Sequence, residues 1–258
     1  MRWTSSEIKN HAVAAARLTA IKDRAFAYLA AHPRASECEV ERFVQTEFRK
    51  NGLVAQKPFY TQIVGFNAHT ATPHYFPPKR GSARLKPETL VLLDTWARLR
   101  QGYDGQARLK KMRAPYADIT WIAYLGKKVP REIQKVFEIV LRARDACLTH
   151  LRRQLARGRM PTGAEMDGIA RGVITKARYG KNFIHNTGHC MGFTSPHGKG
   201  VNLSRRFRRP LERNVGYTIE PGIYLKGRFG IRSEINFYIT SKNKVIVTTP
   251  MQRRIVRI

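Results

Sequence analysis

The sequence predicts a mixed α+β fold built as two similar halves, each a pair of helices followed by a sheet. Helix-start signals with apolar stripes come in pairs, once near the start of the chain and once after its middle. Short β-like runs follow each pair. The 258 residues, 42% of them hydrophobic, can bury one sizeable core. We therefore expect a single pseudo-symmetric domain over residues 1–258, with a site between its halves.

In the first half, two helices are predicted before the strands. Thr4 and Glu7 have the spacing of a capping box, and apolar residues then recur every three or four positions until a proline ends the pattern. Ser36 and Glu39 repeat the box before a second stripe, and Gly52 offers a left-handed exit. The β-like runs that follow include residues 89–93 and 116–125.

The second half repeats this order. A long apolar stripe over residues 133–155 predicts a helix, and a shorter helix begins at the box of Thr162 and Glu165 and ends at Gly180. Residues 217–225 and 231–240 read as strands. In the second of these, alternate positions are apolar, and one face carries Arg232, Glu234 and Asn236.

Charge and cysteine usage describe a basic, folded protein. The chain has 48 Lys and Arg against 18 Asp and Glu, a formal charge of +30, yet its apolar residues are spread too evenly for a disordered basic tail. No apolar run is long enough to span a bilayer, and the start has no apolar signal core. The three cysteines, Cys38, Cys147 and Cys190, form no paired spacing, which favours a reducing compartment. We expect a cytoplasmic protein with no membrane partner.

Four carboxylates lie on predicted core strands, where ionised groups are costly. They are Asp94, Asp118, Glu220 and Glu234. Any one of them alone is best explained by pairing with an arginine at a sheet edge, but four together favour bound divalent cations. His189 adds an imidazole, and an oxygen-rich set with one imidazole suits manganese, cobalt, iron or zinc better than a thiolate-type zinc centre. The residues therefore predict a two-metal site.

These residues resemble the pita-bread metallopeptidases, the family of proline dipeptidase, aminopeptidase P and methionine aminopeptidase. The resemblance runs from about Ser5 to Thr240. Its motifs are the His-Asn-Thr-Gly-His segment at 185–189, Thr-Ile-Glu-Pro-Gly at 218–222 and Arg-Ser-Glu at 232–234. It implies the pita-bread fold, two helix-pair-plus-sheet halves around a two-metal site, without the separate amino-terminal domain of the Xaa-Pro enzymes.

The resemblance also implies the metal ligands. Asp94 would bind one ion, Asp118 and Glu234 would bridge both, and His189 and Glu220 would bind the other. Glu220 would in addition hold and deprotonate the bridging water. Two divalent ions are expected, with manganese favoured over cobalt, zinc or iron.

Four further residues take roles from the same resemblance. His74 and His197 match histidines of the family that contact the reacting centre, where they would stabilise the oxyanion or pass a proton to the leaving amine. His185 and Arg232 are expected in the substrate-binding pocket. A lone histidine is more often structural, so these roles depend on the surrounding motifs.

The sequence also departs from the family pattern. Asp94 and Asp118 are 24 positions apart, wider than is usual, so the basic residues 98–113 are expected to form a hairpin insertion near the site. Asp104 is then an alternative first ligand, although its glycine neighbours are typical of a turn. Cys190 stands where a glycine is usual, which would either narrow the pocket or make the site sensitive to oxidation.

Three functions follow as expectations. The first is a metal-dependent exopeptidase that cleaves a short peptide at its amino-terminal bond, Xaa-Pro above others, by a metal-bridging hydroxide. The second is a methionine aminopeptidase. The third is a non-catalytic protein of the same fold that binds RNA or another polyanion, for which the arginines of residues 205–213 are the strongest sign. Polyanion association as a secondary property and a homodimer are both left open.

Overall fold

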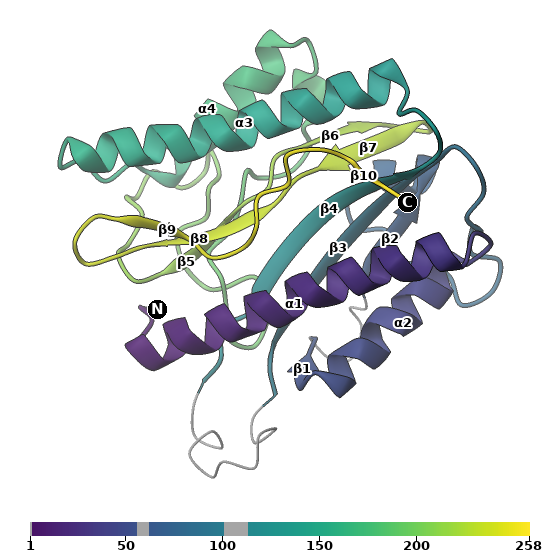
Figure 1. Cartoon of the computed structure of the whole chain (residues 1–258). Coiled ribbons are helices and arrows are strands. Elements are labelled where there is room, and N and C mark those ends of the chain that lie inside the picture. The colour runs from purple at the N-terminus through teal and green to yellow at the C-terminus, as the bar shows by residue number, and fades with distance from the viewer. Residues whose placement is uncertain (1, 56–61, 101–112) are drawn as a thin grey trace.

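Two helix pairs enclose the strands from opposite sides in the computed structural model (Figure 1). The structure describes residues 2–55, 62–100 and 113–258. The helices are α1 (Ser5–Ala31), α2 (Glu37–Lys50), α3 (Arg131–Ala156) and α4 (Gly163–Lys176). Each half thus supplies one helix pair, as the sequence predicts. None of the helices in the described ranges is both long and apolar enough to cross a membrane.

The predicted helix starts are confirmed by their capping geometry. Thr4, Ser36 and Thr162 each accept a hydrogen bond from the backbone N–H three residues on, and the glutamate there bonds back to the backbone of the cap. Each such cap stabilises its helix by about 1 kcal/mol. The exit of α2 is also confirmed, since Gly52 has φ +61°.

The predicted end of α4 at Gly180 is wrong. The helix ends at Lys176, and Arg178 takes the left-handed conformation with φ +68°. Gly180 instead begins a short 3₁₀ helix, η3 (Gly180–Asn182). A non-glycine residue provides the left-handed turn, so the position of the glycine misplaces the helix end.

The first half contains a five-stranded sheet centred on β3. Its strands are β1 (Leu53–Val54), β2 (Ile63–Phe66), β3 (Thr89–Leu99), β4 (Ala117–Leu125) and β10 (Val256–Arg257). β3 pairs antiparallel with β1, β2 and β4, and the C-terminal β10 returns to pair parallel with β4. A second 3₁₀ helix, η1 (Asn67–Ala71), follows β2.

The predicted end of the β-like run at residue 93 is wrong. β3 continues to Leu99, so Asp94 lies in the interior of the strand. Every residue from Thr89 to Ala97 is buried, because both faces of this strand are covered. A strand buried on both faces lacks the alternation of polar and apolar residues that marks its extent in the sequence.

The strands of the second half are shorter than predicted. β5 (Gly216–Ile219), β8 (Ile235–Ile239) and β9 (Val245–Val247) form one sheet, and β6 (Gly222–Leu225) pairs with β7 (Phe229–Arg232). The predicted continuous strands at 217–225 and 231–240 are therefore each broken once.

The two breaks lie together and carry two of the predicted metal ligands. One is at Glu220 and Pro221, where proline has no N–H to continue a ladder. The other is at Ser233 and Glu234. The N–H of Ser233 donates to the carbonyl of Pro221 at 3.4 Å, so one break contacts the other.

A side-chain amide joins the two halves at their centre. Asn236 on β8 accepts from the N–H of Asp118 at 2.9 Å and donates to its carbonyl at 2.6 Å. The amide of Asn236 thus pairs with the backbone of β4 as the backbone of a neighbouring strand would, and it holds β8 beside β4. The carboxylates of both halves are thereby brought to one place.

Candidate metal centre and active site

A cavity of about 510 Å³ brings together eight of the nine predicted site residues. They are His74, Asp94, Asp118, His189, His197, Glu220, Arg232 and Glu234. The ninth, His185, lines an adjoining cavity of about 150 Å³. The predicted residues therefore converge on one place, although their individual roles stay predictions.

The first half supplies its two aspartates from one face of paired strands. In the register of β3 and β4, Asp94 lies opposite Thr120 and Trp96 lies opposite Asp118. Opposed residues and residues two apart share a face, so all four side chains point the same way. Asp94 and Asp118 are 7% and 5% exposed.

The second half brings His189 and Glu220 into contact through close backbone approach. The N–H of Thr218 donates to the carbonyl of His189 at 2.9 Å, and the N–H of Glu220 donates to the carbonyl of Thr187 at 2.8 Å. A Cβ atom at Gly188 would lie 2.1 Å from the carbonyl oxygen of Thr218. Glycine is required there for the two segments to come this close.

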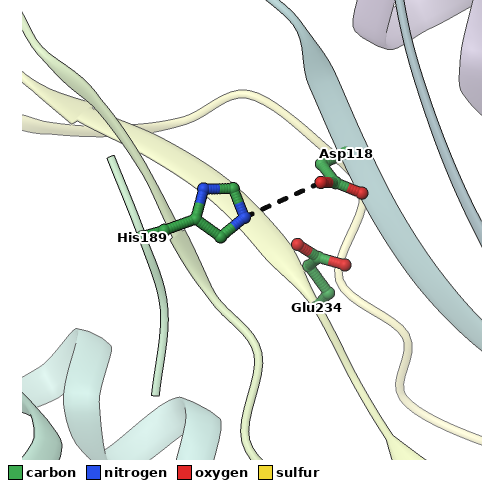
Figure 2. Close-up of side chains that lie close together, drawn as sticks. All are labelled: Asp118, His189 and Glu234. Atoms are coloured by element: carbon green, nitrogen blue, oxygen red, sulfur yellow. Dashed lines mark ion pairs between the residues drawn. The ribbon is translucent and has the colours of Figure 1, made fainter. Parts of the chain in front are cut away.

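His189 presents a lone pair to the carboxylates. Its Nδ1 lies 3.0 Å from the carbonyl oxygen of Cys190, which only accepts, so Nδ1 carries the ring proton. Burial lowers the pKa of His189 to about 4, which keeps the ring neutral at pH 7. Nε2 is then an acceptor and lies 3.8 Å from Asp118 Oδ2 (Figure 2). It also lies 3.5 Å from Glu220 Oε1.

The carboxylates also have oxygen atoms that no described group satisfies. Asp94 Oδ1, Asp118 Oδ1 and Glu234 Oε1 are buried and have no hydrogen-bond partner among the described residues. Ligand atoms of Asp118, His189 and Glu234 all lie within 4.8 Å of one another. Acceptors that face one another without a proton donor need a cation between them, so this donor set fits divalent metal ions.

Burial shifts the acid–base behaviour of the same groups. It raises the pKa of Asp118 and of Glu234, and the neighbouring carboxylates raise both further. Burial likewise raises the pKa of Glu220 to about 7. Each shift reflects the cost of holding negative charges together away from water. A bound cation would offset that cost.

Arg232 is the cation that the chain itself provides. It is 3% exposed, forms an ion pair with Asp94 Oδ2 and donates to Thr120 Oγ1 at 3.0 Å. It also donates to Tyr224 Oη at 2.9 Å and to the carbonyl of Pro73 at 3.3 Å. The sequence places Arg232 in the substrate pocket, and the structure places it at the cavity wall, where it neutralises one of the four carboxylates.

The three other predicted site histidines differ in whether their ring nitrogens already have hydrogen-bond partners. His74 and His197 are exposed at the cavity, and the His197 ring lies 4.0 Å from that of His189. His185 contacts the carbonyl of Asn186 at 2.8 Å and Tyr224 Oη at 2.7 Å, which occupies both ring nitrogens. His74 and His197 are therefore better placed than His185 to donate to a bound peptide.

Cys190 points away from the predicted ligands. Its side chain is 3% exposed, and Cβ atoms at Gly198 and Gly200 would lie 3.1 and 3.0 Å from its sulfur. Burial raises the pKa of the thiol, which disfavours the reactive thiolate. Sensitivity to oxidation is thus the less favoured of the two expectations. Asp104 and most of the predicted insertion at 98–113 lie outside the described residues.

Sequence reasoning missed several polar residues that hold the site. Thr120 donates to Glu234 Oε2 at 2.8 Å, and Thr218 donates to Glu220 Oε1 at 3.1 Å. Each threonine is two positions along the chain from a predicted ligand, and that spacing could have identified it. Arg144 on α3, fully buried, donates to Ser233 Oγ at 2.7 Å, and nothing in the helix pattern distinguishes it from exposed arginines nearby.

Comparison with known proteins identifies the family. Metallopeptidase family M24 matches residues 11–241. A Bacillus subtilis protein named as a candidate dipeptidase, YkvY, is 31% identical over 213 residues, which are 83% of this chain and 51% of that protein. The chain spans about half the length of the curated relatives it matches.

Solved structures of two Xaa-Pro enzymes have the same fold. An Xaa-Pro dipeptidase from Bacillus anthracis superposes with a TM-score of 0.80 at 27% identity, covering 100% of this chain and 64% of that one. An X-Pro aminopeptidase from Thermotoga maritima gives 0.78 at 26% identity, covering 100% and 65%. The resemblance to the pita-bread metallopeptidases and the predicted fold are both confirmed, and the chain belongs to metallopeptidase family M24.

Proposed function

We propose that this chain is a metal-dependent exopeptidase that hydrolyses the amino-terminal bond of short peptides, with Xaa-Pro peptides preferred. Membership of the family supports a metallopeptidase. The Xaa-Pro preference is supported by the names of the structural neighbours and by Arg232 and His74, which line the same cavity. The alternative within the family is a methionine aminopeptidase.

One observation carries the catalytic proposal. The Nε2 lone pair of His189 faces the acceptors of Asp118 and Glu220 with no donor between them. In His185 and His11, by contrast, both ring nitrogens have hydrogen-bond partners. The arrangement of His189 therefore favours a ligand over a structural role.

The residues that would hold two divalent ions are Asp94, Asp118, His189, Glu220 and Glu234. When bound, such ions lower the pKa of a water molecule and polarise the scissile carbonyl. Manganese is favoured because four of the five side chains offer oxygen. Arg232 balances only one of the four carboxylates, which leaves an excess of about three negative charges for the ions to neutralise.

The chain's own groups supply the proton transfers. Glu220 lines the cavity beside the other predicted ligands, where it is suited to accept a proton from the attacking water. Thr218 Oγ1 holds one oxygen of Glu220, which leaves the other available. His74 and His197 would donate N–H bonds to the oxyanion that forms on the peptide, or would relay to the leaving nitrogen the proton that Glu220 has accepted.

Chelation and a peptide scan test this function. The purified protein should lose turnover in EDTA and regain it with Mn²⁺, and it should cleave Xaa-Pro dipeptides and tripeptides. Metal analysis should find about two ions per chain. Exclusive cleavage after Met would replace the proposal with a methionine aminopeptidase. Full turnover in EDTA after metal has been removed would exclude a metallopeptidase.

A second candidate function is binding of a nucleic-acid backbone, favoured by one surface segment. Residues 205–209 contain four exposed arginines, Arg205, Arg206, Arg208 and Arg209, and no carboxylate of the described residues forms an ion pair with them. The segment packs on the start of α4, where Ala164 N–H donates to the carbonyl of Phe207 at 2.8 Å. A guanidinium group that has no carboxylate partner can donate two parallel hydrogen bonds to the oxygens of one phosphate.

RNA binding can be tested separately from catalysis. A labelled single-stranded RNA should bind with an affinity that falls with salt, and replacing the four arginines by alanine should weaken binding and reduce the salt dependence. Replacing four scattered exposed arginines is the control, for which we choose Arg2, Arg42, Arg131 and Arg254. An equal loss in both variants would mean that net charge alone attracts RNA.

A further inference from the structure

Glu37, the first residue of α2, is a fully buried carboxylate with four donors. Its Oε1 accepts from the N–H of Phe66 at 2.7 Å and lies 2.8 Å from Nδ1 of His69. Its Oε2 accepts from Tyr75 Oη at 2.8 Å and from the N–H of Ala83 at 3.2 Å. Both oxygens are satisfied, as the polar atoms of a buried side chain need to be. Glu37 also lies in the first turn of α2, where the positive end of the helix dipole favours an acidic side chain.

The four donors come from a single stretch of chain, residues 66–83, which has little regular structure of its own. It comprises the end of β2, the short helix η1 and an irregular segment. Glu37 therefore ties this stretch together from a helix that is distant from it in the sequence. Its loss would free two backbone amides and two side chains at once.

His74 lies inside this stretch, between two fixed points. On one side, Tyr75 is held by Glu37 through its hydroxyl and stacks on the His69 ring, with centroids 4.4 Å apart. On the other side, Arg232 donates to the carbonyl of Pro73 at 3.3 Å. The backbone of His74 is thus fixed by a buried anion after it and a buried cation before it.

The second half of the fold uses the same device. Asp167 on α4 is buried and accepts from the N–H and the hydroxyl of Thr187 at 3.1 and 2.9 Å. Arg171, paired with Asp167, donates to the carbonyls of Phe183 and His185 at 2.8 Å each. In each half, a carboxylate on the second helix of the pair fixes a segment that carries a site histidine.

We infer that Glu37 is a positioning residue for the reaction, acting through Tyr75 to fix the His74 ring at the cavity. The inference rests on the proposed function in that His74 is taken to act on the peptide. It goes beyond that function because it gives a role in turnover to a side chain outside the cavity. Glu37 itself touches neither the proposed ligands nor a bound peptide.

A double-mutant cycle tests the coupling. Tyr75→Phe removes one hydroxyl and leaves the other three bonds of Glu37, so the chain should fold normally. We expect kcat to fall about 10-fold with KM and metal content little changed. In a His74→Ala background, Tyr75→Phe should have no further effect, because residues that act through one another are not additive. Independent, multiplying losses would overturn the inference.

Glu37→Gln and Glu37→Asp complete the kinetic series, with Glu39→Gln as the matched control. Glu39 is two residues away on α2, and among the described residues it bonds to the cap of that helix and to Arg84. Asp retains the charge and should recover part of the kcat that Gln loses. Glu39→Gln should leave kcat unchanged. Equal kcat for the Gln and Asp variants of Glu37 would contradict a role for the carboxylate.

A spectroscopic readout separates this inference from the proposed function. In histidine-labelled protein, Tyr75→Phe and Glu37→Gln should shift the His74 signals, while Glu39→Gln should not. Hydrogen exchange should speed up at the amides of Phe66 and Ala83 in Glu37→Gln. If the parent lacks peptidase activity but these changes occur, the proposed function fails and the positioning stands. Unchanged His74 signals and exchange would overturn the positioning whatever the activity.

Discussion

Asp118→Asn should stabilise the chain in EDTA and gain less stability than the parent from Mn²⁺. The side chain is 5% exposed, its Oδ1 has no described partner, and burial and Glu234 raise the pKa of its carboxyl. Asparagine has the same shape and no charge. Without divalent ions, the substitution therefore removes repulsion, and with them it removes a ligand.

The magnitude follows from the spacing of the ligand atoms. Atoms of Asp118 and Glu234 lie within 4.8 Å. Two unit charges at that distance repel by about 3.5 kcal/mol at an effective dielectric constant of about 20. Attraction to Arg232 offsets part of this, so we expect a net gain of about 1–2 kcal/mol, or a rise in Tm of about 2–8 °C for a chain of this size.

The pH dependence has a definite sign. A carboxyl whose pKa is raised by folding contributes stability at low pH and loses it as the pH rises through the folded value. Burial raises the pKa of Asp118, Glu234 and Glu220, the last to about 7. In EDTA, the advantage of Asp118→Asn should therefore be small at acid pH, where the raised pKa values keep these carboxyls protonated, and should grow as the pH rises.

Thermal unfolding in EDTA and in excess Mn²⁺ is the assay. At about 100 times its Kd, bound metal stabilises the parent by about 2.7 kcal/mol, and the variant should gain less than half of that. Glu138→Gln removes the same charge at an exposed position on α3, and it should change the Tm in neither condition. A lower Tm for Asp118→Asn in EDTA, or an undiminished gain with Mn²⁺, would refute the reasoning.

Three further predictions concern the histidines. His74→Ala and His197→Ala should each lower kcat about 100-fold with metal content retained, measured by steady-state kinetics and metal analysis, because both are placed to act on the peptide rather than on the ions. His189→Ala should instead lower metal content, and normal metal content in this variant would exclude His189 as a ligand. Burial lowers the pKa of His11 from 6.5 to about 4, so its neutral ring contributes about 3 kcal/mol that is present above pH 6.5 and lost as the pH falls toward 4. His11→Gln should flatten the acid side of the stability profile while His32→Gln, at an exposed position, should not, and parallel profiles would contradict this.

Local signals in the sequence located most of the helices and identified the candidate site residues. Capping boxes are read within four residues, so the starts at Ser5, Glu37 and Gly163 need no tertiary information. The predicted ligands likewise occur in short motifs. The structure adds that their side chains share one cavity, which motif spacing alone does not establish.

The strand breaks and the supporting network depend on contacts that are distant in sequence. Residues 216–225 are apolar enough for one strand, and the break at Glu220 exists because its N–H bonds to Thr187 rather than to a strand partner. Arg144 is similar to its exposed neighbours in sequence, and its burial is favourable because it pairs with Asp145 and donates to Ser233 and to the carbonyl of Gln252, the last two distant in sequence. Such features follow from tertiary packing, which overrides local propensity.

The fold separates the two kinds of site residue by how firmly they are held. Asp94 and Asp118 lie on paired strands, where backbone ladders hold them against mutual repulsion. His74 lies in an irregular segment that Glu37 and Arg232 hold by side-chain bonds. Charges that repel need the stiffer support, whereas a neutral ring needs only orientation. Substitutions that loosen the His74 segment should therefore lower turnover before they lower stability, and substitutions that loosen the strand ladders should do the reverse.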